Sequence, residues 1–166
     1  MPATYEPIAT TISGSTTARF TFSSIGNSYT DLVLIFRGTV TPSDGLALQL
    51  NNDSATNYSN TFLAGNGSTV STNRNTTQNY IYLDNLGVLS GSTPGFYRIN
   101  LFSYAGSTNK TILIETSSDK NGSGSVERIV GLWRSTSAIT DISIFSQNGY
   151  TINAGFSATL YGILKA

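Results

Sequence analysis

The sequence contains no histidine and no cysteine, and only 11% of its 166 residues are charged. Without histidine and cysteine the chain can form neither a Ser–His–Asp nor a Cys–His catalytic group, and no Cys/His zinc site. It also has no disulfide framework. These absences exclude triad hydrolases, cysteine proteases and domains built on a Cys/His zinc site.

An excess of charge of one sign is also absent. Nine Lys and Arg residues balance nine Asp and Glu residues, so the formal net charge is zero. Proteins that bind nucleic acids or anionic membranes rely on an excess of positive charge. We therefore expect neither a nucleic acid nor a membrane as partner.

Long apolar runs are missing as well. The longest, at residues 32–36, is far shorter than the roughly 18–20 residues that span a bilayer. The first eleven residues contain no basic residue ahead of an apolar stretch, unlike a secretory signal. We therefore expect the protein to be made in the cytoplasm of the cell that produces it.

Short neutral polar side chains dominate instead. The chain has 23 Thr, 23 Ser and 15 Asn, together 61 of its 166 residues. Hydrophobic residues make up 39% and aromatic residues 11%, too much for a disordered linker. The length predicts one domain over residues 1–166 with a real core.

The apolar pattern predicts strands and almost no helix. Apolar residues nowhere repeat at helical spacing for more than a turn. Short β segments bounded by Gly, Asn, Asp or Pro are predicted at 18–22, 31–38, 46–50, 60–64, 79–83, 95–104, 111–117, 126–135, 139–145 and 157–164. About ten short strands with uneven loops predict an all-β β-sandwich with jelly-roll topology, rather than an up-and-down barrel.

Two further features bear on the surface of this sandwich. Several strands carry apolar residues on both faces, which indicates that one face packs on the core and the other on a neighbour. Residues 65–79 are polar and rich in Gly, Ser, Thr and Asn. This segment is predicted to be an exposed loop.

One segment has the spacing of a calcium loop. Asp119, Asn121 and Ser123 alternate and are followed by Gly124. Position twelve of such a loop would be Val130 rather than a bidentate Glu, and Glu127 at position nine is only a partial substitute. A hairpin turn between two strands is the favoured interpretation, and we expect no metal site.

A pair of carboxylates could act without histidine. Glu115 and Glu127 lie on neighbouring predicted strands, where two carboxylates could hydrolyse a glycoside. Arg128 and Arg134 are close in sequence, so cross-strand ion pairing is favoured; the register of the hairpin is left open.

Phosphate-binding Gly-rich loops are absent from the sequence. We expect no enzymatic activity and no cofactor.

The aromatic residues admit two interpretations. A sugar-stacking platform could draw on Trp133 and on tyrosines 29, 58, 80, 82, 97, 104, 150 and 161. Packing in the core or in a subunit interface is the favoured alternative.

Segments spread over most of the chain resemble a family of small β-rich virion proteins of tailed bacteriophages. They are PGFY (94–97), LFSYAGST (101–108), KT (110–111), VERIVGLWR (126–134), SAI (137–139), ATLYGI (158–163), YEPIATT (5–11) and YTDL (29–32). The resemblance is weakest at 65–79, and none of its segments is a catalytic motif.

The resemblance implies a structural protein, in the first place a capsid decoration (cement) protein. Such a protein is a homo-oligomer, with a trimer favoured, that binds the major capsid protein on the exterior of the virion after assembly in the host cytoplasm. The alternative is a receptor- or glycan-binding module of a tail tip or fibre. In residues 1–12, Tyr5 and Ile8 are candidate protein contacts if this segment lies along a neighbouring subunit; an edge strand of its own sandwich is the alternative.

Overall fold

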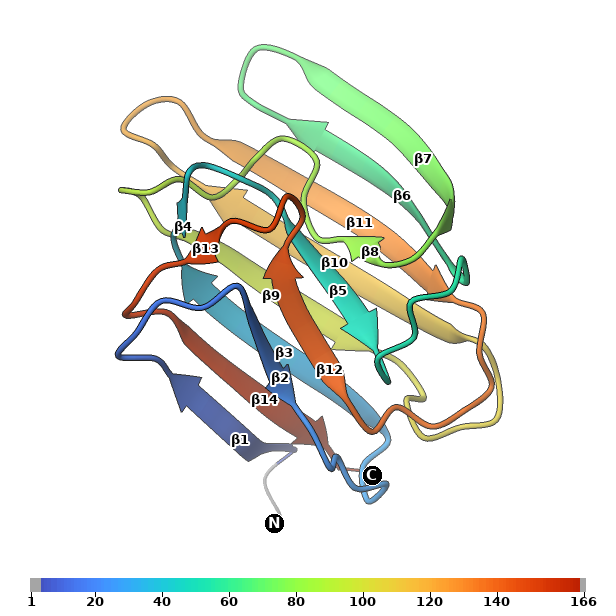
Figure 1. Cartoon of the computed structure of the whole chain (residues 1–166). Coiled ribbons are helices and arrows are strands. Elements are labelled where there is room, and N and C mark those ends of the chain that lie inside the picture. Colours follow the sequence, from blue (N-terminus) through green and yellow to red (C-terminus); the bar gives the residue numbers. More distant parts are fainter. Residues whose placement is uncertain (1–3, 165–166) are drawn as a thin grey trace.

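The computed structural model describes residues 4–164, which form two β-sheets packed face to face (Figure 1). The large sheet has eight strands, in the order β1–β14–β3–β9–β10–β11–β6–β7, and the small sheet has four, in the order β2–β12–β5–β8. The predicted all-β β-sandwich is confirmed, with fourteen strands in the described part of the chain in place of about ten. No helix within the described range is long and apolar enough to cross a membrane.

The strands of both sheets pair antiparallel throughout. The large sheet contains β1 (Tyr5–Ile12), β3 (Asp31–Gly38), β6 (Tyr58–Gly65), β7 (Val70–Gln78), β9 (Gly95–Leu101), β10 (Lys110–Ser118), β11 (Ser125–Trp133) and β14 (Ser157–Ile163). The small sheet contains β2 (Arg19–Phe22), β5 (Leu46–Leu50), β8 (Ile81–Tyr82) and β12 (Ile142–Ser146). Two short strands, β4 (Val40–Thr41) and β13 (Thr151–Ile152), pair with each other beside the sheets.

The chain passes repeatedly from one sheet to the other. It crosses directly between β1 and β2, β2 and β3, β5 and β6, β7 and β8, β8 and β9, and β11 and β12. It also crosses from β3 to β5 by way of β4 and from β12 to β14 by way of β13. Such crossings are typical of a jelly roll, whereas β9, β10 and β11 form a meander within the large sheet. This meander supplies the centre of both faces of that sheet.

Alternation along the strands creates the core. In β10, Ile112 and Ile114 are buried while Leu113 and Glu115 face outward, because successive side chains of a strand point to opposite faces. A stack of aromatic rings then joins the two sheets. Phe20 of β2 lies 5.6 Å from Phe36 of β3 and 4.9 Å from Phe156, between ring centroids. Stacked rings of this kind stabilise a core beyond their buried area.

The prediction of a loop at 65–79 is wrong, because most of this segment is strand β7. It pairs with β6 in a hairpin that turns at Asn66, whose side-chain oxygen accepts hydrogen bonds from the backbone of Ser68 (3.0 Å) and Thr69 (2.8 Å). Strand β7 lies at the edge of the large sheet, beyond the margin of the small sheet (Figure 1). Neither of its faces packs on the core, so it needs none of the apolar alternation by which strands are recognised.

The N-terminal segment is an edge strand of its own sandwich. Strand β1 pairs with β14 along its whole length, with a β-bulge between Pro7 and Ala9. Tyr5 is exposed and packs edge-on against Tyr161 at 6.4 Å, and Ile8 is half-buried against the core. Residues 5–12 thus form the edge strand, one of the two alternatives for this segment, while residues 1–3 lie outside the described range. That Tyr5 and Ile8 contact a partner protein stays a prediction.

A glycine in β11, Gly131, allows the small sheet to pack closely on the large sheet. A Cβ atom added to Gly131 of β11 would lie 2.8 Å, 3.0 Å and 3.3 Å from three side-chain atoms of Ile81 in β8. Ile81 itself is fully buried. Glycine at 131 thus lets the edge strand of the small sheet rest directly on β11.

We predict that Gly131→Ala destabilises the protein by about 1–3 kcal/mol, because the added methyl group overpacks the core. In an Ile81→Ala background the same substitution should cost much less, since the clashing atoms are gone. Denaturant unfolding of the two single variants and the double variant measures this coupling. Strictly additive effects would contradict the proposed contact.

Candidate functional site

The outer face of the large sheet carries an exposed apolar patch. We call this the outer patch and define it by Leu63, Val70, Phe96, Val126 and Val130, which are between 41% and 75% exposed. Its residues come from β6, β7, β9 and β11, and strand register brings them together. Phe96 and Val126 both lie opposite Ser117 of β10, one on each side of it.

A hollow of about 510 Å³ lies within the outer patch. Four members of the patch line it, and Glu115 and Arg128 form part of its polar wall. Solitary exposed apolar residues are common on protein surfaces, but a contiguous apolar patch rimmed by polar residues is typical of an interaction site. The outer patch is therefore the first candidate functional surface.

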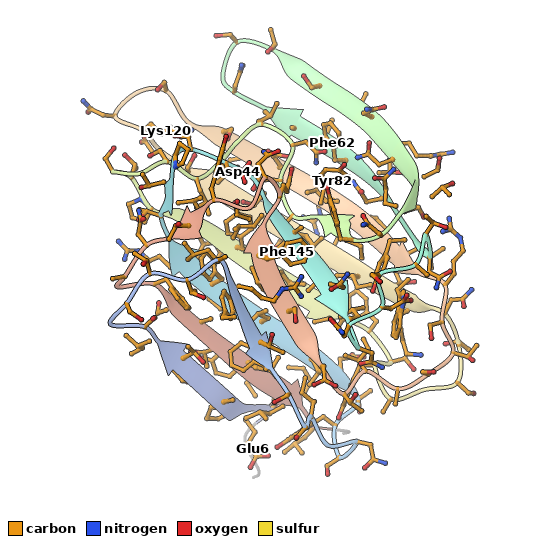
Figure 2. All side chains as sticks on the ribbon, viewed as in Figure 1. Glu6, Asp44, Phe62, Tyr82, Lys120 and Phe145 are labelled. Atoms are coloured by element: carbon orange, nitrogen blue, oxygen red, sulfur yellow. The ribbon has the colours of Figure 1, made fainter. Side chains whose placement is uncertain are left out.

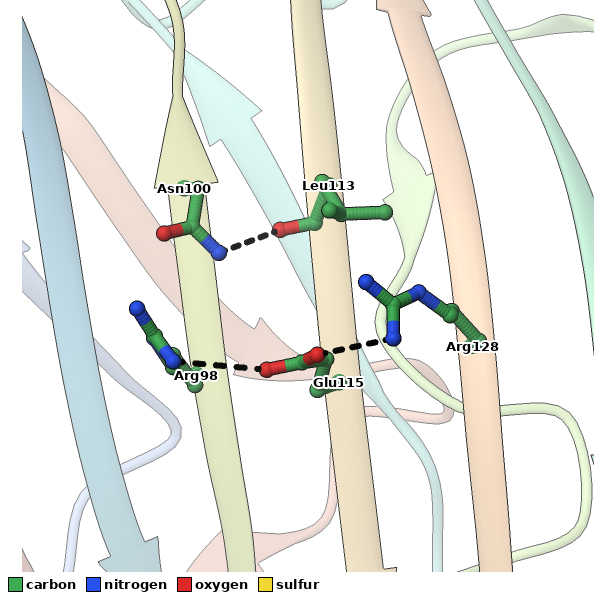
Figure 3. A network of polar contacts seen from close by, with 5 residues as sticks. All are labelled: Arg98, Asn100, Leu113, Glu115 and Arg128. Carbon is green, nitrogen blue, oxygen red and sulfur yellow. Dashed lines mark hydrogen bonds and ion pairs between the residues drawn. The ribbon is translucent and has the colours of Figure 1, made fainter.

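A row of charged side chains runs across the same face (Figure 3). Glu115 of β10 lies between two arginines, with Arg128 of β11 at 3.0 Å and Arg98 of β9 at 3.8 Å. The three residues lie side by side because Glu115 is in register with both arginines. Exposed ion pairs contribute only about 0–1 kcal/mol, so folding alone does not require this row.

The zero net charge conceals an uneven distribution. Within residues 4–164, the alternation of side chains along the strands places only two carboxylates, Asp31 and Glu115, on the outer face of the large sheet. It places five arginines on or beside the same face: Arg37, Arg74, Arg98, Arg128 and Arg134. The face is therefore positively charged. The sequence could not reveal this, because net charge is a sum over the whole chain.

Several of the balancing carboxylates are buried. Asp84 accepts hydrogen bonds from the backbone amides of Leu46 (3.1 Å), Gly87 (3.1 Å) and Val88 (3.3 Å) and from the Tyr97 hydroxyl (2.5 Å). Burial raises the pKa of Asp84, although these hydrogen bonds oppose the rise. Asp84 thus fixes the loop between β8 and β9.

Glu127 fixes the same loop from β11. Its carboxylate accepts hydrogen bonds from the backbone amides of Asn85 and Leu86, both at 2.9 Å. Burial raises the pKa of Glu127 also. Lys120 adds a third attachment by donating a hydrogen bond to the carbonyl oxygen of Gly87 at 2.8 Å.

The hypothesis of a catalytic carboxylate pair is wrong. Glu115 is in register with Arg128, whereas Glu127 is in register with Thr116. Glu115 therefore lies on the outer face of the sheet and Glu127 on the inner face, so the two cannot act on one substrate. The predicted cross-strand ion pair is confirmed for Arg128, while Arg134 instead donates a hydrogen bond to Ser59 Oγ at 3.0 Å.

The segment from Asp119 to Gly124 is the predicted hairpin turn between β10 and β11. Asp119 Oδ1 accepts a hydrogen bond from the backbone amide of Gly122 at 3.1 Å. Asn121 and Gly122 have φ angles of 60° and 93°, as a tight turn requires. Within residues 4–164 no group of three or more His, Cys, Asp or Glu side chains is placed to hold a metal ion.

Trp133 is a core residue and belongs to no platform. It is buried, stacks on Tyr58 at 6.2 Å and donates a hydrogen bond from Nε1 to Asp53 at 2.7 Å. Tyr58, Tyr97 and Tyr104 are fully buried. For these residues the favoured interpretation of core packing is correct.

Other aromatic residues cluster on the outer face of the small sheet. We call this the aromatic cluster and define it by Tyr80, Tyr82 and Phe145, which are half-buried. The ring of Tyr80 lies 5.0 Å from Tyr82 and 5.7 Å from Phe145, edge-on in both cases. The guanidinium group of Arg19 lies 4.1 Å from the centre of the Phe145 ring. Figure 2 shows Tyr82 and Phe145 over the small sheet, with Asp44 beside them.

A polar hollow of about 320 Å³ adjoins the aromatic cluster. Tyr82 forms one wall, and the other walls include Ser43, Asp44, Asn85 and Gln147. Asp44 is buried and is held by a hydrogen bond from the Ser146 hydroxyl and by the backbone amide of Asn148 at 3.0 Å. The sequence offered no signal for this hollow, because the residues that line it come from three separate segments.

Comparison with known proteins identifies no family. No family model matches the chain, and no curated protein matches it. Among solved structures it is similar to the galectin LEC-6 of Caenorhabditis elegans, with a TM-score of 0.40 and 11% identity over 94% of this chain and 96% of that one. A toad ovary galectin in complex with thio-digalactose gives 0.40 and 12% over 86% and 98%. Domains LG4-5 of the mouse laminin alpha1 chain give 0.36 and 14% over 93% and 41%.

We predict that Asp84→Asn destabilises the protein by about 2 kcal/mol at pH 4, because the amide nitrogen cannot accept the hydrogen bonds that one of the two carboxyl oxygens accepts. The folded state holds the proton of Asp84 more tightly than the unfolded state does. The stability that this proton brings is complete below the ordinary carboxyl pKa near 4 and is lost as the pH rises through the raised pKa of the folded state.

The difference in unfolding free energy between wild type and Asp84→Asn should therefore shrink from pH 4 to pH 8. Urea unfolding at both pH values measures it. A difference that grows with pH would show that the ionised carboxylate is the favoured form and would contradict this assignment.

Proposed function

We propose that the protein is a non-enzymatic virion structural protein, a capsid decoration (cement) protein that binds the major capsid protein of a tailed bacteriophage. The observation that supports this most strongly is the outer face of the large sheet, where an apolar patch and an excess of arginines share one broad surface. The sequence resemblance is the ground for proposing a phage particle, and the outer face is the surface that we propose to bind the major capsid protein.

The chemistry of the face defines its partner. Apolar anchors such as Phe96 and Val126 need complementary apolar surface, and aromatic residues and arginines are the side chains most enriched in protein interfaces. Five arginines against two carboxylates favour an acidic partner. We therefore propose that the shell surface beneath the protein is acidic and bears apolar side chains.

A broad sheet of eight strands suits a lattice. Its six inner strands are fixed on both sides by neighbours, so little entropy is lost when the face docks. If the protein binds only the expanded shell, each bound copy stabilises that state by mass action. Many copies, and the trimer that the resemblance implies, multiply the effect.

The proposal places the protein on the capsid exterior after assembly in the host cytoplasm. Quantitative mass spectrometry of purified particles should find it in a copy number that scales with the major capsid protein. Absence from the particle, or a handful of copies with the tail proteins, would overturn the proposal.

Replacing two exposed apolar residues of the outer patch by Asp should release the protein from the particle without unfolding it. We predict that Leu63→Asp with Val126→Asp lowers the particle-bound copy number at least about tenfold, because both side chains lie exposed in the proposed contact. The matched control is Thr16→Asp, an exposed residue in a loop of the described chain. Equal loss with Thr16→Asp, or no loss with the double variant, would contradict the assignment of this face.

A further inference from the structure

We infer that the aromatic cluster and the adjoining hollow form a binding site for a neutral, hydroxyl-rich saccharide. This site lies on the small sheet, on the side of the sandwich opposite the outer patch. It goes beyond the proposed structural role, and either assignment can fail without the other.

Ring geometry provides the first argument. Tyr80 contacts Tyr82 and Phe145 edge-on, so the three rings support one another in fixed orientations. Burial raises the pKa of Tyr80 to about 12, with the Tyr82 hydroxyl and Asp44 contributing. Aromatic groups that are held rigidly but remain partly exposed present apolar area at little entropic cost. The C–H face of a pyranose ring is a natural partner for such a surface.

The polar surroundings provide the second argument. Arg19 donates a hydrogen bond to Gln49 Oε1 at 3.1 Å, and Thr21 shares one with Ser143 at 2.8 Å. These contacts line the outer face of the small sheet next to Phe145. Ligand sites typically combine apolar walls with a few well-placed polar groups that fix orientation.

The hollow beside Tyr82 provides the third argument and indicates the charge of the ligand. Asp44 and Asp84 both line it, and both are buried. Asp84 already accepts four hydrogen bonds, so Asp44, which accepts three, is the carboxylate that can accept one more from a sugar hydroxyl. The Asp44 carboxylate repels sialic acids, uronic acids and sulfated sugars, so the site favours neutral sugars.

The arrangement is not explained by folding alone. The core of the sandwich lies between the sheets and is complete without Tyr80, Tyr82 and Phe145, none of which belongs to the buried set. Other exposed aromatic residues stand apart from this cluster, as Tyr150 does beyond β12. Three converging rings next to a carboxylate-lined hollow therefore indicate a ligand.

The test uses the full chain and neutral tetrasaccharides of glucose, galactose and mannose, with 3′-sialyllactose as the anionic comparison. Titrations followed by amide chemical shifts should show millimolar binding of at least one neutral sugar. The largest shifts should fall at residues 43–45, 80–82 and 145–147. Sialyllactose should bind at least about tenfold more weakly.

Variants then locate the contact. Tyr82→Ala should weaken binding at least about tenfold, and Tyr82→Phe should retain most of it because the ring remains. Tyr150→Ala is the matched control and should leave affinity unchanged. If Tyr82→Ala unfolds, Asp44→Asn provides the second variant, with the same expected loss.

Three results would overturn the inference. These are no binding of any neutral tetrasaccharide at tens of millimolar, shifts centred on the outer patch, and binding of sialyllactose equal to that of the neutral sugars. None of them bears on the copy number in particles, so failure of this site leaves the proposed structural role standing.

Discussion

The unequal width of the two sheets is the constraint on which the rest of the structure depends. Eight strands face four, so the small sheet can bury the inner face of only part of the large one. The contact between Ile81 of β8 and Gly131 of β11 places the edge of the small sheet over β11. Strand β7, at the edge of the large sheet, packs neither face on the core and is mostly polar, and nothing within residues 4–164 covers the outer face of the large sheet.

Separation of charge follows from the same arrangement. Asp84 and Glu127 are buried, and their carboxylates accept hydrogen bonds from backbone amides that fix the loop between β8 and β9. The arginines cannot follow them inward, because a guanidinium group cannot lose its charge. They remain on the outer face of the large sheet. A chain of zero net charge thus presents one positive face, and this face combines charge with apolar anchors as an interface does.

The sequence predicted the sandwich because its central strands alternate cleanly, as Ile112 and Ile114 do against Leu113 and Glu115. It failed at β7, where a strand without a buried face leaves no apolar pattern. It left the relation of Glu115 to Glu127 open because register, which decides the face of each side chain, depends on tertiary pairing. The sequence admits a sugar platform among its aromatic residues, but only the fold separates buried Trp133 from the aromatic cluster on the small sheet.

The orientation of the protein on the particle tests the central claim most directly. An electron cryo-microscopy map of the purified virion, at a resolution that separates the two sheets, would give it. The account predicts clustered copies on the head, with the outer patch and the row of Arg98, Glu115 and Arg128 against an acidic surface of the shell. A map in which the large sheet faces solvent, or in which the head carries no such density, would contradict it.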